Sequence, residues 1–344
     1  MTRFRSATLD CLLAAALFGA GTPAAKALLG PVGPLELAGL LYLGAALATL
    51  PWAVRERALV RRADRRNWAL LAAALLFGGG LGPVLLLWGL AQAPAASVAL
   101  WLNLESVATA LLGWALFREH VHGRTWAAVA LVVGASVVLA APERFAGGTA
   151  AVLVGLACLC WGLDNCVTAL IDRFTPAQTT FAKGVAAGSV NLLLGVTLGG
   201  GWPPTGAVAG ALAVGALSYG LSLVLYITGA QQLGALRSQL LFATAPFWGV
   251  GFSWTLLGEP VGAAQLAAGG LAAAGLWLMH TERHAHEHAH GAQTHTHLHR
   301  HDDGHHTHPH PGRPVWLWHS HEHTHEPLAH AHPHRPDLHH RHEH

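Results

Sequence analysis

Trp88-Gly89-Leu90-Ala91-Gln92 and Thr228-Gly229-Ala230-Gln231-Gln232 are two versions of one corner, and they lie 140 residues apart. The same shift places Glu119-His120-Val121 on Glu259-Pro260-Val261. In both copies an apolar segment of membrane length separates the Gly/Gln corner from the glutamate. A unit with an odd number of spans inserts its second copy upside down, and such inverted repeats build the alternating-access cavity of many secondary transporters. The repeat therefore indicates a transporter.

Charge and hydrophobicity are segregated along the chain. Hydrophobic residues make up 52% of the sequence and charged residues 11%, against about 25% charged residues in a typical soluble domain. Of the 26 histidines, 24 lie at or after His280, whereas residues 1–279 are mainly Ala, Leu, Gly and Val. We therefore expect a membrane domain followed by a separate hydrophilic tail.

Ten apolar segments have the length of a membrane-spanning helix, about 20 residues. Glycine and proline corners separate them, and five lie on each side of Gly147-Gly148. The sequence thus predicts an all-α membrane protein of ten transmembrane helices, arranged as two inverted five-helix repeats (residues 1–147 and 148–280), and a disordered His-rich tail (281–344). The expected spans lie near residues 8–29, 34–54, 67–91, 95–117, 124–141, 150–171, 177–199, 206–230, 235–257 and 261–280.

The basic residues of the short loops predict the orientation. Residues 55–66, between the second and third spans, contain six arginines, and cytoplasmic loops carry the excess of Lys and Arg. With this loop inside, only Lys26 and Arg144 of the membrane domain lie near the outside. We expect a bacterial-type inner (plasma) membrane protein with both termini in the cytoplasm.

The residues at the corners resemble those of the drug/metabolite transporter superfamily, EamA type. The resemblance covers about residues 8–280 in two tandem copies and implies ten helices and export or exchange of a small solute. The chain departs from the family pattern at Ser106, where the family often has a proline, and at Ala169, which takes the place of Lys26 in the second copy. The resemblance is carried by Phe18-Gly19, Pro23, Lys26, Ala95 to Glu119, Trp161-Gly162 and Ala245 to Glu259.

Ionisable side chains inside apolar spans are costly, so each is a functional candidate. Glu105 lies in the middle of a span near Trp101 and Asn103. A medium of low dielectric penalises its charged form, which suits proton coupling or a cationic solute; the alternative is a hydrogen-bonded packing role. Asp164, beside Asn165, is the candidate from the second half, and a purely structural role is an equal alternative for it.

Two lysines and two glutamates lie nearer the span ends. The resemblance implies a cavity or gating role for Lys26, whose charge suits an anionic substrate group or a pair with Glu105. Lys183 is expected to extend to the membrane interface. Glu119 and Glu259 match the family pattern and are expected to be hinge or capping groups rather than substrate ligands.

A polar and aromatic stripe follows one face of the eighth span. Tyr219, Ser222 and Tyr226 are spaced three and four residues apart, and Gln239 lies in the next span. This spacing suits a cavity wall, although tyrosines also anchor at membrane interfaces. The residues expected to line the transport cavity are Lys26, Trp101, Asn103, Glu105, Trp161, Asp164, Asn165, Tyr219, Ser222, Tyr226 and Gln239.

The tail repeats the pattern His-x-His. Imidazoles with interspersed carboxylates suit divalent metals such as Zn²⁺, Ni²⁺ and Co²⁺, and tracts of this composition are typical of disordered metal binders. The alternative is a solvated tail that binds metal only incidentally. The expected ligands are His284, His286, His288, His290, His295, His297, His299, His301, His319, His321, His323 and His325.

The leading hypothesis is a secondary transporter that exports a small metabolite or drug-like solute and requires no cofactor. One alternative is an exporter of Ni²⁺, Co²⁺ or Zn²⁺ itself; another is a non-transporting metal-sensing or interaction protein on a transporter scaffold. Soluble enzymes are disfavoured, because no phosphate loop, nucleophile elbow or helical His-Glu-x-x-His occurs in a suitable context. The expected partners are a small solute, the lipid bilayer and divalent metal ions, with no nucleic acid. The sequence does not decide whether the protein forms a homodimer.

Overall fold

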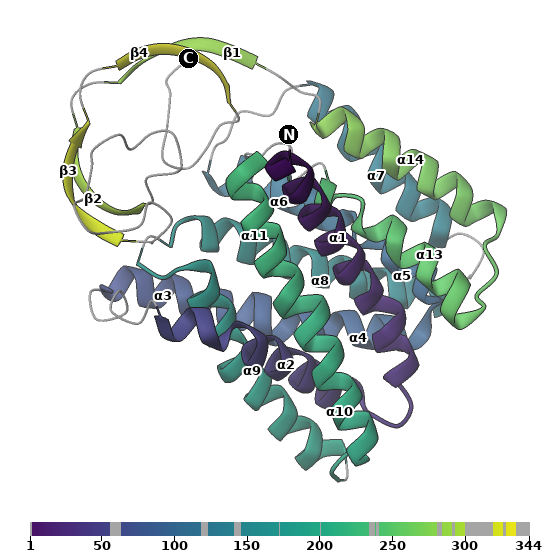
Figure 1. The fold of residues 1–344 in the computed structure, drawn as a ribbon. Helices are drawn as coiled ribbons and strands as arrows, with labels where there is room; N and C mark the ends of the chain where they lie inside the picture. The colour runs from purple at the N-terminus through teal and green to yellow at the C-terminus, as the bar shows by residue number, and fades with distance from the viewer. Residues whose placement is uncertain are drawn as a thin grey trace.

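The computed structural model shows a bundle of long helices joined by short corners (Figure 1). It describes residues 2–55, 63–117, 123–140, 146–171, 173–199, 201–233, 238, 241–280, 284–290, 293–299, 319–325 and 328–334. The helices of the first half are α1 (Thr2–Leu28), α2 (Pro34–Arg55), α3 (Arg65–Ala74), η2 (Leu75–Leu81), α4 (Gly82–Gln92), α5 (Ala95–Trp101), α6 (Leu104–Phe117) and α7 (Gly123–Ala140). Those of the second half are α8 (Ala146–Ala169), α9 (Pro176–Gly199), α10 (Thr205–Val214), η3 (Gly215–Leu221), α11 (Ser222–Leu233), α13 (Ala245–Leu257) and α14 (Ala263–His280).

Among the described residues, 7 helical stretches are long and apolar enough to cross a membrane. The predicted fifth and tenth spans correspond to two shorter apolar helices, Trp126–Leu139 and Ala263–Leu278. The predicted ninth span is described in part, as α13 and the residues just before it. The seven long stretches are Ala7–Leu28, Pro34–Arg55, Arg65–Gln92, Ala95–Ala115, Gly148–Ala169, Pro176–Gly199 and Thr205–Gly229.

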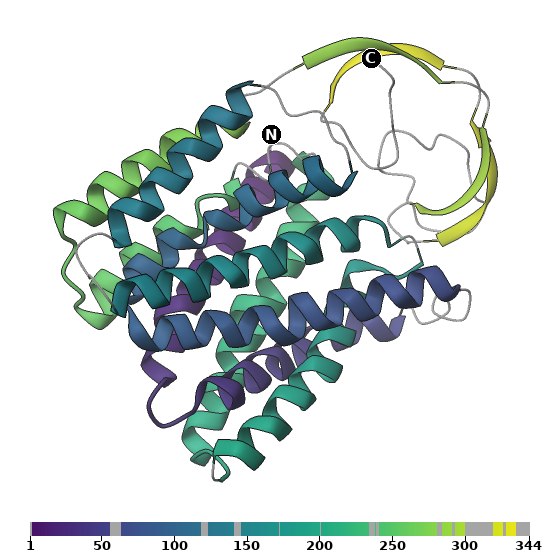
Figure 2. The same cartoon turned by 180° about the vertical axis from the view of Figure 1, so that it is seen from behind.

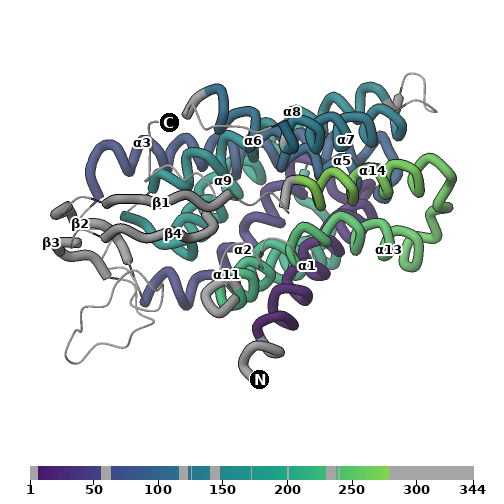
Figure 3. Tube along the Cα trace, turned by 90° about the horizontal axis from the view of Figure 1, so that it is seen from above, coloured from purple at the N-terminus to yellow at the C-terminus, as the bar shows by residue number. Residues whose placement is uncertain are grey.

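The helix boundaries repeat at the interval seen in the sequence. Helix α7 begins at Gly123 and α14 at Ala263, and the π-helices η2 and η3 begin at Leu75 and Gly215, 140 residues apart in each case. The packing repeats as well: α1 contacts α11 as α8 contacts α4, and α2 contacts η3 as α9 contacts η2. Helix α2 also packs on α9, and α7 on α14 (Figure 3). The two halves therefore exchange equivalent contacts.

Glycines allow α2 and α9 to approach closely. A Cβ atom on Gly188 would lie 3.0 Å from the carbonyl oxygen of Gly39, and one on Gly39 would lie 2.6 Å from the Cβ of Leu192. Small residues at such crossings let helix backbones meet within a membrane, where packing rather than water exclusion drives association.

The predicted span 95–117 is interrupted, which the hydrophobicity pattern did not show. Helix α5 ends at Trp101 and α6 begins at Leu104. At the break, the Asn103 side chain donates from Nδ2 to the carbonyl oxygen of Leu100 at 2.9 Å. Asparagine side chains compete in this way with the backbone bonds of a helix.

Helix α3 begins at a polar cap outside the apolar stretch. Asp64 Oδ1 accepts hydrogen bonds from the backbone N–H and from Nδ2 of Asn67, both at 2.8 Å. These bonds favour the ionised carboxylate and hold the pKa of Asp64 below its usual value. The cap satisfies one of the unpaired amides at the start of the helix.

The structure describes four segments of the tail that the sequence predicts to be disordered. They form β1 (His284–His290), β2 (Gln293–His299), β3 (His319–His325) and β4 (Leu328–His334), in which β1 pairs antiparallel with β4 and β2 with β3. Alternation of histidine with other residues has the period of a strand, whereas the prediction of disorder rests on composition. The strands lie beyond the end of the bundle at which α1 begins and α14 ends (Figures 1 and 2).

Candidate functional site

An ion pair lies within the helical bundle between α8 and α9. The Nζ atom of Lys183 lies 2.6 Å from both carboxylate oxygens of Asp164, and Thr168 Oγ1 donates to Asp164 Oδ1 at 3.0 Å. The two charged side chains are only 14% and 11% exposed. The prediction that Lys183 extends to the interface is wrong, because a buried carboxylate one helix away offers its ammonium group a stronger partner than water at the helix end.

The π-helix η2 brings a backbone carbonyl beside this ion pair. The carbonyl oxygen of Gly78 accepts hydrogen bonds from Tyr42 OH at 2.5 Å and from Trp161 Nε1 at 3.1 Å. A Cβ atom on Gly78 would collide with the carboxylate of Asp164, so only glycine lets η2 approach this closely. Single π-helical turns are frequent at functional sites.

Glu105 lies on the other side of α8. Its Oε1 accepts a hydrogen bond from Asn165 Nδ2 at 2.9 Å, and the same amide lies 3.2 Å from Thr109 Oγ1. Since Asp164 and Asn165 are consecutive, α8 directs one polar side chain toward Lys183 and the next toward Glu105. Glu105 is in the first turn of α6, where the helix dipole favours a carboxylate. We call Tyr42, Glu105, Trp161, Asp164, Asn165 and Lys183 the polar cluster.

An aromatic group adjoins the polar cluster. The rings of Tyr42 and Tyr219 stack with centroids 6.2 Å apart, and Phe18 meets Tyr219 edge-on at 5.7 Å. Phe242 lies 5.3 Å from Phe18 and 4.7 Å from Tyr226. Tyr42 thus belongs to both sets. The sequence contains only three tyrosines, and all three meet here, which is a signal that sequence reasoning missed for Tyr42.

Lys26 and Glu259 hold the corner between α4 and α5, which we call the Pro94 corner (residues 90–96). Lys26 Nζ donates to the carbonyl oxygens of Leu90 at 2.6 Å and Ala93 at 2.9 Å. The carboxylate of Glu259 accepts from the backbone N–H groups of Ala95 at 2.8 Å and Ala96 at 2.9 Å. A cation thus meets the end of one helix and an anion the start of the next, as helix dipoles favour. Lys26 does not pair with Glu105, which binds Asn165 instead.

Other predicted cavity residues make hydrogen bonds outside the polar cluster. Trp101 is fully buried and donates from Nε1 to the carbonyl oxygen of Ser136 on α7 at 3.2 Å. Asn103 donates to the Leu100 carbonyl oxygen, three residues earlier, and Ser222 to that of Ser218, four residues earlier. Gln239 and Glu119 lie outside the described residues, as do the side chains of the tail histidines.

Comparisons with known proteins concern the helical domain as a whole. Residues 6–141 and 148–281 each match the sequence model of the EamA-like transporter family. A protein of Methanothermobacter thermautotrophicus, named an uncharacterized transporter, is 26% identical over 229 residues; the match covers 64% of this chain and 66% of that protein. A solved crystal structure of a protein superposes with a TM-score of 0.59 at 18% identity, covering 80% of this chain and 96% of that one; at this identity it supports the fold alone.

Proposed function

Because the chain belongs to the EamA-like transporter family, we propose that this multi-pass membrane protein is a secondary transporter that exports a small solute by alternating access. The observation that carries the proposal is the polar cluster, because charged groups inside apolar helices are costly and mark transport pathways. The aromatic group beside it suits a solute with an apolar part.

We further propose ten transmembrane helices in two inverted units, with both termini in the cytoplasm of a bacterial-type cell. The equivalent contacts of the two halves support the two units, and the arginines of residues 55–66 support the orientation. In this orientation the polar cluster lies in the cytoplasmic half, since Asn165 is near the end of α8 and Lys183 near the start of α9. The Pro94 corner lies at the outer face.

The proposed mechanism exchanges a solute for a proton at Glu105. The hydrogen bond from Asn165 positions its carboxylate. Because Asn165 is exposed, we propose that water and solutes reach this pair from one side. Proton binding neutralises Glu105 and releases a cationic solute from the carboxylate. The emptied site can then change the face to which it opens without an unpaired buried charge. In the form that the structure shows, the Lys26 and Glu259 contacts keep the outer face closed.

Replacement of Glu105 tests the proposal. In proteoliposomes screened with metabolites and drug-like cations, Glu105→Gln is expected to retain folded protein but to lose about 10-fold or more in transport and its dependence on pH. The matched control is Asp10→Asn, which makes the same change of charge near the start of α1. Normal, pH-dependent transport by Glu105→Gln would assign Glu105 a packing role.

The tail is proposed to bind divalent metal ions. The strand register supports this, because it places His286 opposite His332 and His297 opposite His321, and directly opposed residues have Cβ atoms about 4.5–5.5 Å apart. Within the described part of the membrane domain, no group of three or more His, Cys, Asp or Glu could hold a metal ion, so the proposal confines the metal to the tail.

Metal binding should depend on pH, because only the neutral imidazole is a ligand. The full chain is expected to bind several Zn²⁺ ions at about pH 7.5 and to release most of them by about pH 5, below the unperturbed histidine pKa of about 6.5. Equilibrium dialysis measures this, with a chain that ends at His280 as the control. Equal binding by both chains contradicts a metal-binding tail. Unchanged solute export by the shortened chain would assign the tail to regulation.

A further inference from the structure

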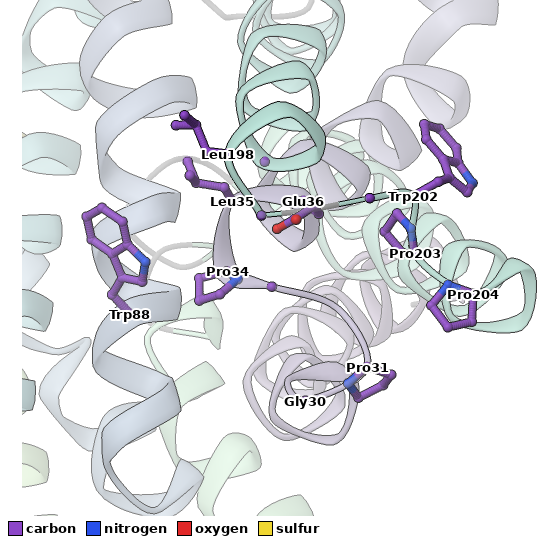
Figure 4. Close-up of a pocket in the computed structure, with 14 residues that line it drawn as sticks. Gly30, Pro31, Pro34, Leu35, Glu36, Trp88, Leu198, Trp202, Pro203 and Pro204 are labelled. Atoms are coloured by element: carbon purple, nitrogen blue, oxygen red, sulfur yellow. The ribbon is translucent and has the colours of Figure 1, made fainter.

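A cavity of about 520 Å³ lies far from the polar cluster, where the α1–α2 and α9–α10 corners meet α4 (Figure 4). This volume falls within the range of small-molecule sites, about 300–1,000 Å³. Its walls include Trp88 and Trp202 together with prolines of both corners, Pro31, Pro34 and Pro203. Proline has a fixed backbone angle and no flexible side chain, so the walls are preformed.

Glu36 is the acidic group of this cavity. It lies in the first turn of α2 and is only 7% exposed. Its carboxylate rests against two glycines, because a Cβ atom on either Gly33 or Gly199 would collide with it. Within the part of the chain that the structure describes, no hydrogen bond or ion pair reaches this carboxylate. The start of α2 stabilises a negative charge only modestly, whereas burial of an unpaired charge is strongly unfavourable.

The lining residues indicate which kind of cation completes the site. Apart from Glu36, they are glycines, prolines, leucines and tryptophans, so the side chains provide a single carboxylate. Calcium requires about six to eight oxygen ligands. An organic ammonium ion requires one anionic partner and is attracted to aromatic faces. Trp88 and Trp202 flank Glu36 (Figure 4) and are 43% and 64% exposed.

We propose that this cavity binds an organic ammonium ion, with the nitrogen at Glu36 and the hydrocarbon part against Trp88, Trp202 and the prolines. The site is independent of the transport function proposed above. Its ligand has two sources with the same chemistry: a soluble alkyl- or arylammonium ion, or the ethanolamine headgroup of a lipid, since tryptophans at helix ends lie at the level of the headgroups.

The test uses the purified full chain in detergent, with phenethylammonium as the probe and the neutral 2-phenylethanol as its isostere. Calorimetry should show phenethylammonium binding about tenfold or more tightly than the alcohol, a comparison that needs no variant. Glu36→Gln should abolish that preference, and Trp202→Leu should weaken binding of the probe. Trp254→Leu, which changes an exposed tryptophan on α13, should not.

A second measurement identifies the source of the ligand. In nanodiscs of phosphatidylglycerol the probe should bind as in detergent. Weaker binding in nanodiscs of phosphatidylethanolamine assigns the site to the lipid headgroup, and equal binding assigns it to a soluble amine. Equal affinity for the ammonium ion and the alcohol, or a preference that survives Glu36→Gln, overturns the proposal.

Discussion

Neutralising one member of the Asp164–Lys183 pair is expected to destabilise the protein by about 3–5 kcal/mol, because the remaining charge is left buried without its partner. Both Asp164→Asn and Lys183→Met should show this loss in thermal or denaturant unfolding in detergent. The double variant Asp164→Asn/Lys183→Met should regain most of the stability, since no unpaired charge remains. Transport should stay impaired in all three variants, because the pair belongs to the polar cluster.

Thr168→Val is the control for this cycle. It removes the hydroxyl that donates to Asp164 Oδ1 but leaves the ion pair, so the expected loss is about 1 kcal/mol. If the stability loss of the double variant equals the sum of the two single losses, the two charges do not depend on each other. Full transport by the double variant would make the pair a structural element only.

Loss of the Glu259 carboxylate is expected to open the Pro94 corner. Glu259→Ala removes two hydrogen bonds from a charged acceptor to the amides of Ala95 and Ala96, each worth about 1.5–3 kcal/mol. If these contacts exist only in the form closed at this corner, the equilibrium should shift toward the open form by about tenfold or more. The control is Gln92→Ala, since the Gln92 side chain donates a hydrogen bond to the carbonyl oxygen of Trp88 in its own helix.

The interval of the sequence repeat recurs in the starts of two helices. Helix α7 begins at Gly123 and α14 at Ala263, at the interval that aligned the Gly/Gln corners. The repeat does not extend to the polar cluster. In the alignment that places Ala169 on Lys26, the position equivalent to Asp164 in the first half is Gly21, so the carboxylate of the charged pair occurs in one half only. A comparison of the two halves residue by residue shows this asymmetry in the sequence.

The direction of each side chain was not predictable from the pattern. Lys183 lies close enough to a helix end to reach either water or the interior, and the choice depends on Asp164 across the helix interface. The π-helix η2 depends on tertiary contacts as well, because Tyr42 and Trp161 bind the Gly78 carbonyl from other helices. Glu36 gave no signal at all, since a glutamate in the first turn of a helix is ordinary.

The measurement that tests alternating access most directly is the accessibility of Asn165. The reporter is Asn165→Cys in a chain whose four cysteines are replaced, treated with a membrane-impermeant maleimide in vesicles of both orientations. If access alternates as proposed, Asn165→Cys should be labelled in inside-out vesicles and only slightly in right-side-out vesicles. Adding Glu259→Ala should slow the inside-out labelling about tenfold. Faster labelling from the outer face than from the inner face before Glu259→Ala is added, or inside-out labelling that Glu259→Ala leaves unchanged, would contradict alternating access.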